Sequence, residues 1–428
     1  MKINEFLKER ESRIRPAEAN KMNLKRLNKI DFSGQIHLTD KKTNTDMILI
    51  KKGDLVISGI NVEKGAVAVY QGNEDILATI HYSAYIFDKS KIDIEYFKIF
   101  LRSKSFKDII NSQTKNGIKT EIKAKIFLQL EINLPGLENQ IKIRNKLQNK
   151  INIIKNYSDV EEKNEYYISK LRQAILQEAV QGKLVPQDPK DEPASELIKK
   201  IKAEKEKLIK EGKIKKEKPL PPISKEEIPY GLPKGWGWCR LGMIMEICRG
   251  ASPRPIKHFL TNSSLSYNWI KIGDANTGKY ITQTAEKITK EGALKSVIVN
   301  KGDLIMSNSM SFGKPRILNI NGCIHDGWLA FKFNHDLLNK DFLYILLSAQ
   351  QDYYESKASG TGVRNLNINR VSEMPITLPP LAEQKRIVEK VDKLIAYCDE
   401  LEKQVKKNQE NAEKLMEAIL KESFENDR

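Results

Sequence analysis

One motif occurs twice in this chain, as LPGLENQ at residues 134–140 and as LPPLAEQ at residues 378–384. The match continues without a gap over residues 134–178 and 378–422, and 15 of the 45 aligned positions are identical. Further upstream, KGDLVIS at residues 52–58 matches KGDLIMS at residues 301–307. This period is far too long for a solenoid, so the chain contains two copies of a unit, each a domain followed by a long helix.

Both predicted helices carry a seam of mainly apolar residues at alternating steps of four and three, which is typical of a coiled coil. The seam residues are Ile143, Leu147, Ile154, Ile168, Leu171 and Ile175 in the first helix, and Ile387, Val391, Leu394, Leu401, Val405, Leu415 and Ile419 in the second. Asn164 and Asn408 occupy the same seam position in both helices. These asparagines either fix the register of the coil or lie solvated at its edge.

Two helices of matched length can bury their seams against each other. We therefore predict an α+β protein with a pseudo-two-fold internal repeat, in which two mixed α/β domains are separated by two long antiparallel coiled-coil helices. The expected segments are domain 1 (residues 1–133), helix 1 (134–182), a charged helix and Pro-rich linker (183–229), domain 2 (230–377) and helix 2 (378–428).

Four strands are expected in matching order in each domain. In domain 1 they are Met47–Ile50, Asp54–Ser58, Ala66–Tyr70 and Ile76–His81. Their expected counterparts in domain 2 are Val297–Val299, Asp303–Ser307, Arg316–Ile320 and Leu329–Phe333. Alignment of Ile80-His81 with Ile324-His325 makes the two histidines equivalent, and we expect them to be buried structural residues rather than bases of a nuclease.

Composition indicates a polyanionic partner. The formal net charge is +17, although a Lys-rich composition without a nucleic-acid role is the alternative. No apolar run of 18 residues occurs, so we expect no membrane partner, and the N-terminus lacks the apolar core of a signal peptide. The four cysteines have neither metal-ligand nor disulfide spacing, which favours a reducing, cytoplasmic location.

Sequence signals for catalysis are absent. The chain has no G-x-x-x-x-G-K-[ST] phosphate loop and no H-E-x-x-H or C-x-x-C zinc pair. We therefore expect no catalytic residue, no metal site and no cofactor in this chain.

Signals for DNA binding are stronger, because polar and basic residues lie beside glycines in predicted turns, where the backbone can approach phosphates. Arg can bond guanine through two N–H groups, and Asn can bond adenine in a similar way. The candidates are Asn61, Lys64, Lys115, Lys119 and Thr120 in domain 1, and Arg249, Ser252, Arg254, Asn308, Ser309, Lys314, Arg316, Thr361, Arg364 and Asn365 in domain 2. Such turns are often merely solvated, so each residue alone is a weak predictor.

Several motifs together resemble the specificity subunit of type I restriction–modification systems. They are the two Leu-Pro-x-Leu…Gln motifs, QGKLVPQDP at residues 181–189 with DEPA at 191–194, LPKGW at 232–236 and IHDGWL at 324–329. Domain 1 departs from the pattern because it lacks the Pro-x-x-Trp sequence with which domain 2 begins.

The resemblance implies a non-catalytic subunit that binds double-stranded DNA in a sequence-specific manner. Each domain would read one half of a bipartite target, and the coil would set the spacing and dock two methyltransferase subunits, with restriction subunits joining through them. S-adenosylmethionine, ATP and magnesium would then belong to those partner subunits. Two alternatives remain, which are a DNA-acting enzyme (nuclease or methyltransferase) with its own site, and a coiled-coil adaptor that does not bind DNA.

Overall fold

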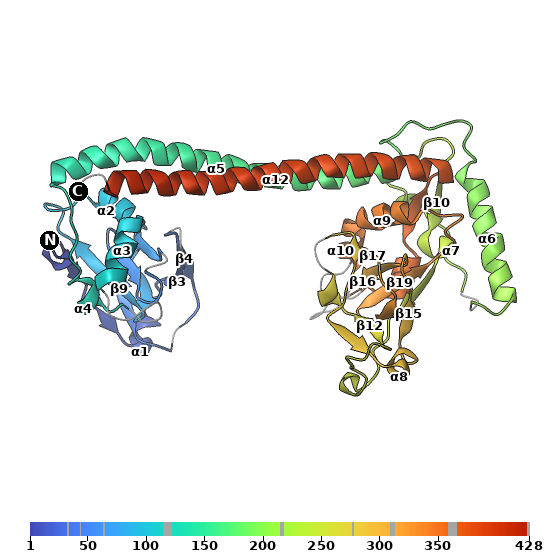
Figure 1. Ribbon diagram of the computed structural model, residues 1–428, viewed down its shortest axis with the longest axis horizontal. Coiled ribbons are helices and arrows are strands. Elements are labelled where there is room, and N and C mark those ends of the chain that lie inside the picture. Colours follow the sequence, from blue (N-terminus) through green and yellow to red (C-terminus); the bar gives the residue numbers. More distant parts are fainter. Residues whose placement is uncertain are drawn as a thin grey trace. The chain divides into compact units, whose positions relative to one another are not determined.

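The structure is a computed structural model that describes residues 1–31, 34–42, 44–62, 65–113, 122–214, 218–275, 278–308, 313–357 and 366–425. It divides into two compact units, of which unit 1 comprises Met1–Asn164 with Gln404–Arg428, and unit 2 comprises Glu165–Lys403. Each unit contains one mixed α/β domain and a part of each of two long helices, α5 (Leu137–Val180) and α12 (Leu381–Glu425) (Figure 1).

Two β-sheets form domain 1. The first is antiparallel and has the order β1-β9-β6-β7, and the second has the order β2-β5-β8-β3-β4 with β3 parallel to β8. The strands are β1 (Leu7–Glu9), β2 (Arg13–Ile14), β3 (Arg26–Ile30), β4 (Ile36–Thr39), β5 (Met47–Ile50), β6 (Leu55–Ser58), β7 (Val67–Val69), β8 (Ile76–Thr79) and β9 (Tyr82–Phe87). The short helices are η1 (Ile3–Glu5), α1 (Pro16–Ala19), α2 (Ile94–Phe100), α3 (Lys104–Gln113) and α4 (Ala124–Phe127).

Domain 2 repeats this arrangement, with sheets of order β11-β19-β16-β17-β13 and β14-β12-β18-β15 and a separate β10-β20 pair. Its strands are β10 (Gly237–Arg240), β11 (Glu246–Arg249), β12 (Tyr267–Ile270), β13 (Tyr280–Ile281), β14 (Glu286–Ile288), β15 (Val297–Val299), β16 (Leu304–Ser307), β17 (Pro315–Leu318), β18 (Gly322–Ile324), β19 (Trp328–Lys332) and β20 (Pro375–Leu378). The helices are α6 (Ala194–Lys210), η3 (Lys225–Glu227), α7 (Leu241–Ile244), η4 (Ile256–His258), η5 (Ile272–Asp274), α8 (Lys290–Ala293), α9 (Lys340–Ser348), α10 (Gln351–Lys357) and α11 (Ile368–Ser372).

The internal repeat is confirmed at the level of the sheets. Strands β9-β6-β7 of domain 1 correspond to β19-β16-β17 of domain 2. In domain 1, β8 lies between the antiparallel strand β5 and the parallel strand β3. In domain 2, β18 lies in the same way between the antiparallel strand β15 and the parallel strand β12. The repeated Lys-Gly-Asp motif forms the turn before β6 and before β16. Its glycines, Gly53 and Gly302, have φ angles of +89° and +97°, which glycine adopts without the strain that a Cβ would cause.

One expected equivalence is wrong by two residues. Ile50 pairs with Ile76 in domain 1, whereas Val299, which takes the same place before the Lys-Gly-Asp turn, pairs with Gly322. Continuing along both strands makes Thr79, and not His81, the counterpart of His325. The expected match of Ile76–His81 with Leu329–Phe333 is also wrong, because β8 corresponds to β18 and β9 to β19. A two-residue shift keeps every side chain on the same face, so alternation in the sequence cannot reveal it.

Helices α5 and α12 pack antiparallel within each unit. In unit 1, Leu147 and Ile154 of α5 form one apolar cluster with Ala412 and Ile419 of α12. In unit 2, Nη2 of Arg172 contacts carboxylate oxygens of Asp399 at 2.6 Å and Glu402 at 2.8 Å.

Most of the predicted seam is buried, but three of its leucines are not. Leu171, Leu401 and Leu415 are 45%, 49% and 53% exposed, so the expectation that they lie in the seam is wrong. A pair of helices covers a narrower stripe than the whole apolar face of either helix, which leaves one edge of that face in solvent. Ile143 and Leu394 are half-buried, and the other predicted seam residues are buried.

The repeated asparagines contribute to a polar layer in the seam of unit 1. The carboxylate of Glu161, which is 4% exposed, accepts hydrogen bonds from Nδ2 of Asn164 at 3.1 Å and Nδ2 of Asn408 at 3.0 Å. Sliding one helix along the other would separate the buried carboxylate of Glu161 from Asn408, its donor on the other helix, so this layer favours a single register.

The segment after α5 is bound to the first turn of α12. The carboxylate of Glu383, which is 1% exposed, accepts hydrogen bonds from Nε2 of Gln187 and Nε1 of Trp236 at 3.2 and 3.0 Å. Gly182 has a φ angle of +71°, and a Cβ there would lie 2.4 Å from Pro233. The motifs at residues 181–189 and 232–236 therefore pack against each other at the start of α12.

A buried glutamine joins each long helix to the domain that precedes it. Oε1 of Gln140 accepts a hydrogen bond at 2.9 Å from the backbone N–H of Asp93, the N-cap of α2. Oε1 of Gln384 accepts one at 3.0 Å from the N–H of Asn339, the N-cap of α9. Nε2 of each glutamine donates to the carbonyl of the proline in its own motif, at 2.8 and 3.2 Å.

We predict that Gln140→Ala and Gln384→Ala each lower the free energy of unfolding by about 1–3 kcal/mol, because both changes leave a backbone N–H and a carbonyl without partners. Denaturant unfolding followed by circular dichroism measures the loss. Gln148→Ala is the control, since Gln148 lies exposed on α5 and bonds only to Asn152 among the described residues. Equal stability of all three variants would contradict the prediction.

Candidate nucleic-acid interface

The predicted contact residues at the end of β11 belong to a loop that packs closely on the turn after β18. The backbone N–H groups of Gly250 and Ala251 donate to the carbonyls of Trp328 and Ile324 at 2.9 and 3.1 Å. A Cβ at Gly250 would lie 2.1 Å from the carbonyl oxygen of His325, so only glycine permits this approach. Loop residues 249–254 are thereby held against the turn formed by residues 325–327.

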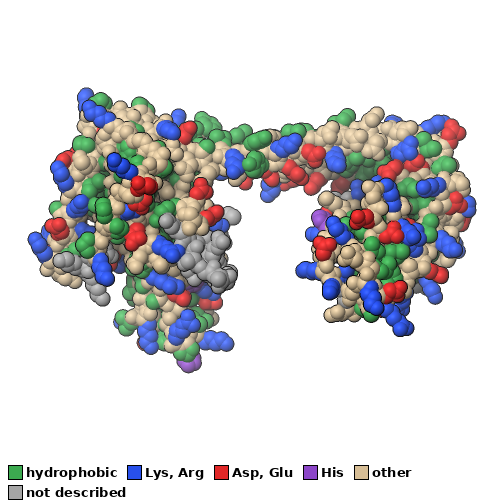
Figure 2. Space-filling view, turned by 180° about the vertical axis from the view of Figure 1, so that it is seen from behind, with side chains coloured by type: hydrophobic (Ala, Val, Ile, Leu, Met, Phe, Trp, Pro, Cys, Tyr) green, Lys and Arg blue, Asp and Glu red, His purple; other side chains and the backbone are tan. Residues whose placement is uncertain are grey.

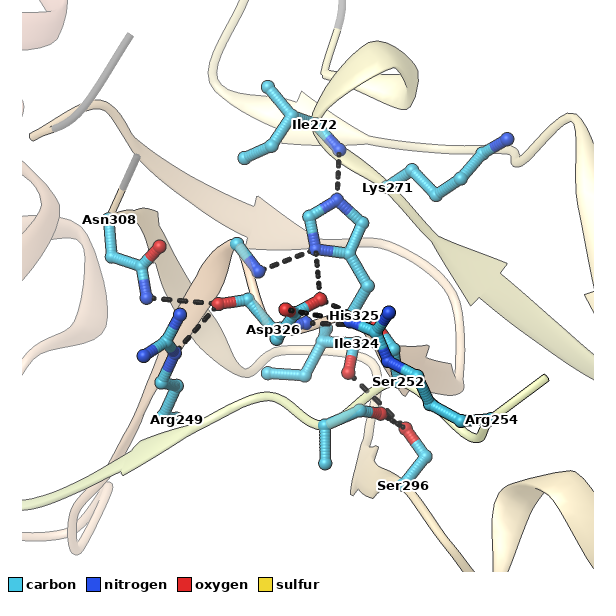
Figure 3. A network of polar contacts seen from close by, with 12 residues as sticks. Arg249, Ser252, Arg254, Lys271, Ile272, Ser296, Asn308, Ile324, His325 and Asp326 are labelled. Carbon is cyan, nitrogen blue, oxygen red and sulfur yellow. Dashed lines mark hydrogen bonds and ion pairs between the residues drawn. The ribbon is translucent and has the colours of Figure 1, made fainter. Parts of the chain in front are cut away.

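Asp326 lies at the centre of a polar network in this turn (Figure 3). Its carbonyl accepts hydrogen bonds from Nε of Arg249 at 2.9 Å and Nδ2 of Asn308 at 3.1 Å. Its carboxylate accepts a bond from Oγ of Ser252 at 2.6 Å and lies 3.8 Å from Nη2 of Arg254. Four residues predicted as DNA contacts therefore meet at one residue of the IHDGWL motif that was not itself predicted as a contact.

The charges of this network are arranged with the cations outward. The hydrogen bond from Ser252 is the main cause that lowers the pKa of Asp326, so its carboxylate is ionised at neutral pH. Arg249 is exposed, and the side chain of Arg254 is 82% exposed. Since Arg249 is bound through Nε, its two terminal nitrogens have no partner among the residues that the structure describes. These nitrogens form the fork that suits a phosphate or a guanine.

Asn308 links this network to the segment that precedes α11. It is 1% exposed, its N–H donates to the carbonyl of Gly327, and its carbonyl accepts from the N–H of Leu366, both at 2.9 Å. In domain 1 the carbonyl of Gly59 accepts from Ile122 at 2.8 Å in the same way. The two domains thus share this backbone link, although only domain 2 has a polar side chain at the position.

The remaining predicted contacts are less informative. Lys314 is exposed beside Gly313, and Arg316 lies on β17 opposite Ile305, with Nη1 donating to the carbonyl of Pro315 at 2.8 Å. Asn61 is half-buried in the turn between β6 and β7. The other candidates, Lys64, Lys115, Lys119, Thr120, Ser309, Thr361, Arg364 and Asn365, lie outside the described residues.

Comparison with known proteins places this network within a recognised family. Residues 233–410 match the family described as the type I restriction modification DNA specificity domain. Residues 233–410 are thus similar to a type I DNA specificity domain. The matched region includes the second globular domain and much of α12, so the resemblance drawn from the sequence motifs is confirmed for that part of the chain.

Relatives and solved structures extend the similarity. The chain is 32% identical over 278 residues to the EcoEI specificity subunit of Escherichia coli, an alignment that covers 62% of this chain and 47% of the relative. The chain thus spans about half the length of the curated relatives that it matches first.

Two solved structures share the fold. One, from work on complex assembly and conformational transition of the type I R-M system, has a TM-score of 0.66 at 16% identity, covering 99% of this chain and 96% of the other. The other, the HsdS subunit from Thermoanaerobacter tengcongensis, has a TM-score of 0.50 at 17% identity, covering 100% and 96%.

Two other features are absent from the residues that the structure describes. Among those residues, no three His, Cys, Asp or Glu side chains are grouped so that they could hold a metal ion. Within the same residues, no helix is both long and apolar enough to cross a bilayer.

His325 supports the Asp326 turn of the specificity domain. Its Nδ1 accepts a hydrogen bond from the N–H of Gly327 at 2.6 Å, and its Nε2 faces the N–H of Ile272 at 3.3 Å. A protonated imidazole donates at both nitrogens and would oppose both of these N–H groups. Burial is the main cause that lowers the pKa of His325, with Asp326 and Asp274 raising it and Lys271 lowering it. The imidazole is therefore neutral in the folded chain at neutral pH.

We predict that acid weakens the fold of unit 2 through His325. The unfolded chain takes up this proton near the ordinary histidine pKa of about 6.5, above the folded value, so the free energy of unfolding falls as pH drops through that range. Thermal unfolding at pH 7.5 and 5.5 measures the loss, and His325→Asn, which keeps an acceptor for Gly327, should reduce it. The exposed His258 is the control position, and an equal effect of His258→Asn would contradict the assignment.

Proposed function

We propose that this chain is the sequence-specific DNA-binding subunit of a type I restriction–modification complex and has no catalytic site of its own. The observation that carries the proposal is a shared sheet skeleton with divergent surface residues. Asp326, at the centre of the polar network, corresponds to the exposed Ile80 in domain 1. Two DNA-binding domains that share one scaffold but differ in their contact residues suit a target whose two halves differ in sequence.

The charge of the chain agrees with this role. A net charge of +17 favours a polyanion, and Figure 2 shows Lys and Arg side chains spread over the surface of both units. Phosphate contacts would supply affinity, while Arg and Asn side chains at base edges would supply specificity. Double-stranded DNA is the ligand that this combination fits, and the cytoplasm is the compartment in which the chain would meet it.

Two equivalent apolar patches on the helices support docking of two copies of one partner. Patch 1 in unit 1 consists of Ile153, Tyr157 and Leu415, which are 69%, 43% and 53% exposed. Patch 2 in unit 2 consists of Tyr397, Leu401 and Leu171, which are 70%, 49% and 45% exposed. Each residue of patch 1 is related to one of patch 2 by the sequence repeat.

Exposed hydrophobic side chains on the helix pair are visible in Figure 2. Clustered apolar residues at a surface are typical of protein interfaces. We assign the patches to two methyltransferase subunits, through which restriction subunits would join. S-adenosylmethionine, ATP and magnesium would be bound by those partners.

The modular nature of recognition can be tested by domain exchange. Replacing residues 1–133 with the corresponding domain of another specificity subunit should change one half of the methylated target and leave the other half unchanged. Methylome sequencing of cells that express the chimaera with its methyltransferase measures the outcome. A change in both halves would contradict the modular reading, and a wild-type chain that directs methylation to no bipartite sequence would contradict the proposed function.

We predict that Tyr397→Lys with Leu401→Lys removes one methyltransferase subunit and that Ile153→Lys with Tyr157→Lys removes the other. Each pair should weaken binding at its patch by at least about tenfold, because a charge replaces buried apolar area in the complex. Native mass spectrometry should show one bound subunit in place of two. Lys403→Ala with Lys407→Ala, on exposed positions of α12 outside the patch, is the control and should retain two.

A further inference from the structure

The side-chain carboxylate of Asp326 is not free to act as a general acidic surface group, because it holds the loop that carries two arginines. Ser252 donates to it at 2.6 Å, and the N–H of Asp326 lies 3.4 Å from the same hydroxyl oxygen. Upstream of Ser252, backbone bonds from Gly250 and Ala251 fasten the loop. The carboxylate extends this anchoring to residues 252–254, where the loop leaves the sheet.

We propose that Asp326 is a positioning residue that directs Arg249 and Arg254 toward the DNA half-site read by domain 2, an inference that rests on the proposed function. The carboxylate of Asp326 itself repels phosphate, so Asp326 aids DNA binding through the side chains that it holds in place. It acts on Arg254 and Ser252 through its carboxylate, and on Arg249 and Asn308 through its carbonyl.

The two arginines are held in different ways, which suits two kinds of contact. Arg249 is bound at 2.9 Å through Nε to a carbonyl, which orients its planar fork and leaves both terminal nitrogens without a partner among the described residues. An oriented fork suits bidentate recognition of guanine. Arg254 makes a long ion pair of 3.8 Å, and its side chain is 82% exposed. Exposed pairs of this kind are weak, so a phosphate can replace the carboxylate at little cost.

This role is confined to one half of the target. The register of β8 and β18 places Ile80 of domain 1 where domain 2 has Asp326. An isoleucine has no acceptor for a loop hydroxyl or a guanidinium. Changes at Asp326 should therefore affect the half-site of domain 2 and leave the half-site of domain 1 as it is.

The test uses the full chain assembled with its methyltransferase. Bound duplexes are selected from a random library, and affinities are then measured on the selected sequence. Asp326→Ala removes the carboxylate that anchors the loop but keeps the carbonyl that binds Arg249. Through the loosened loop it should lower affinity about tenfold and relax the sequence preference at one half-site only. Ser252→Ala should act in the same direction with a smaller effect, because it removes one of the two carboxylate contacts. Asp326→Asn keeps the size of the side chain and provides a second variant if the alanine protein is unstable.

A double-mutant cycle separates positioning from a general loss of structure. In a chain that already carries Arg249→Ala and Arg254→Ala, Asp326→Ala should no longer lower affinity, since the residues that it directs are gone and the carboxylate that it removes repels phosphate. The same loss in both backgrounds, a change at both half-sites, or wild-type binding by Asp326→Ala and Asp326→Asn would overturn this inference alone. A wild-type complex that selects no bipartite sequence would overturn the proposed function and the inference with it.

Discussion

The attachment of each long helix to its domain depends on a buried glutamine that satisfies two backbone groups at once. Each of Gln140 and Gln384 accepts a hydrogen bond from the backbone N–H of a helix N-cap. Each also donates a hydrogen bond to the carbonyl of the proline that precedes its own helix. A buried amide with both of its functions bonded tolerates few orientations, since a lost bond inside a protein costs more than one at the surface. Each glutamine thus helps to fix the direction in which its helix leaves the domain, α5 from domain 1 and α12 from domain 2.

The far ends of the same helices are also anchored to a domain within each unit. The ring of Phe424 near the end of α12 lies 5.6 Å from the rings of Tyr96 and Phe100 in domain 1. The carbonyl of Val180 at the end of α5 accepts a hydrogen bond from Oγ1 of Thr377 at 2.5 Å in domain 2. Val180 and Phe424 occupy the same position of the sequence repeat. Each domain therefore binds the start of one long helix and the end of the other.

Against this repeated framework, the surface loops differ. Both domains use the same Lys-Gly-Asp turn and the same backbone link after β6 and β16. In the part of the chain that the structure describes, the network of Asp326, Ser252, Arg249 and Asn308 belongs to domain 2 alone. Loops on a rigid scaffold can change their side chains without disturbing the core, which is how one fold comes to read different ligands.

Some features of the fold were predictable because they are local or repeated. The seams of α5 and α12, the charged helix at residues 194–210 and the Lys-Gly-Asp turns follow from periodicity and turn chemistry. The exposure of Leu171, Leu401 and Leu415 was not predictable, because a heptad pattern marks an apolar face without stating how much of it a single partner helix covers.

The candidate site was predicted only in part, for the same kind of reason. Arg249, Ser252, Arg254 and Asn308 were predicted as contacts from residue type and from neighbouring glycines, and the structure brings them together at Asp326. Asp326 was quoted within the IHDGWL motif but was not named as a site residue, because an acidic residue in a turn gives no sign of which distant side chains it will meet. Its partners lie 18 to 77 residues away in the chain and come together only when β11, β16 and β19 pair.

The amino-acid sequence by itself determined the repeat, the two long helices, the basic charge and the family to which the second half is related. These properties depend on residue identity, spacing and composition, which need no knowledge of contacts. The tertiary structure alone decided the two-residue register between β8 and β18, the face of the coil left in solvent, and the meeting of four loop residues at Asp326. Each of these depends on which distant backbone groups pair, and backbone groups are the same for nearly every residue, so the sequence does not encode that choice locally.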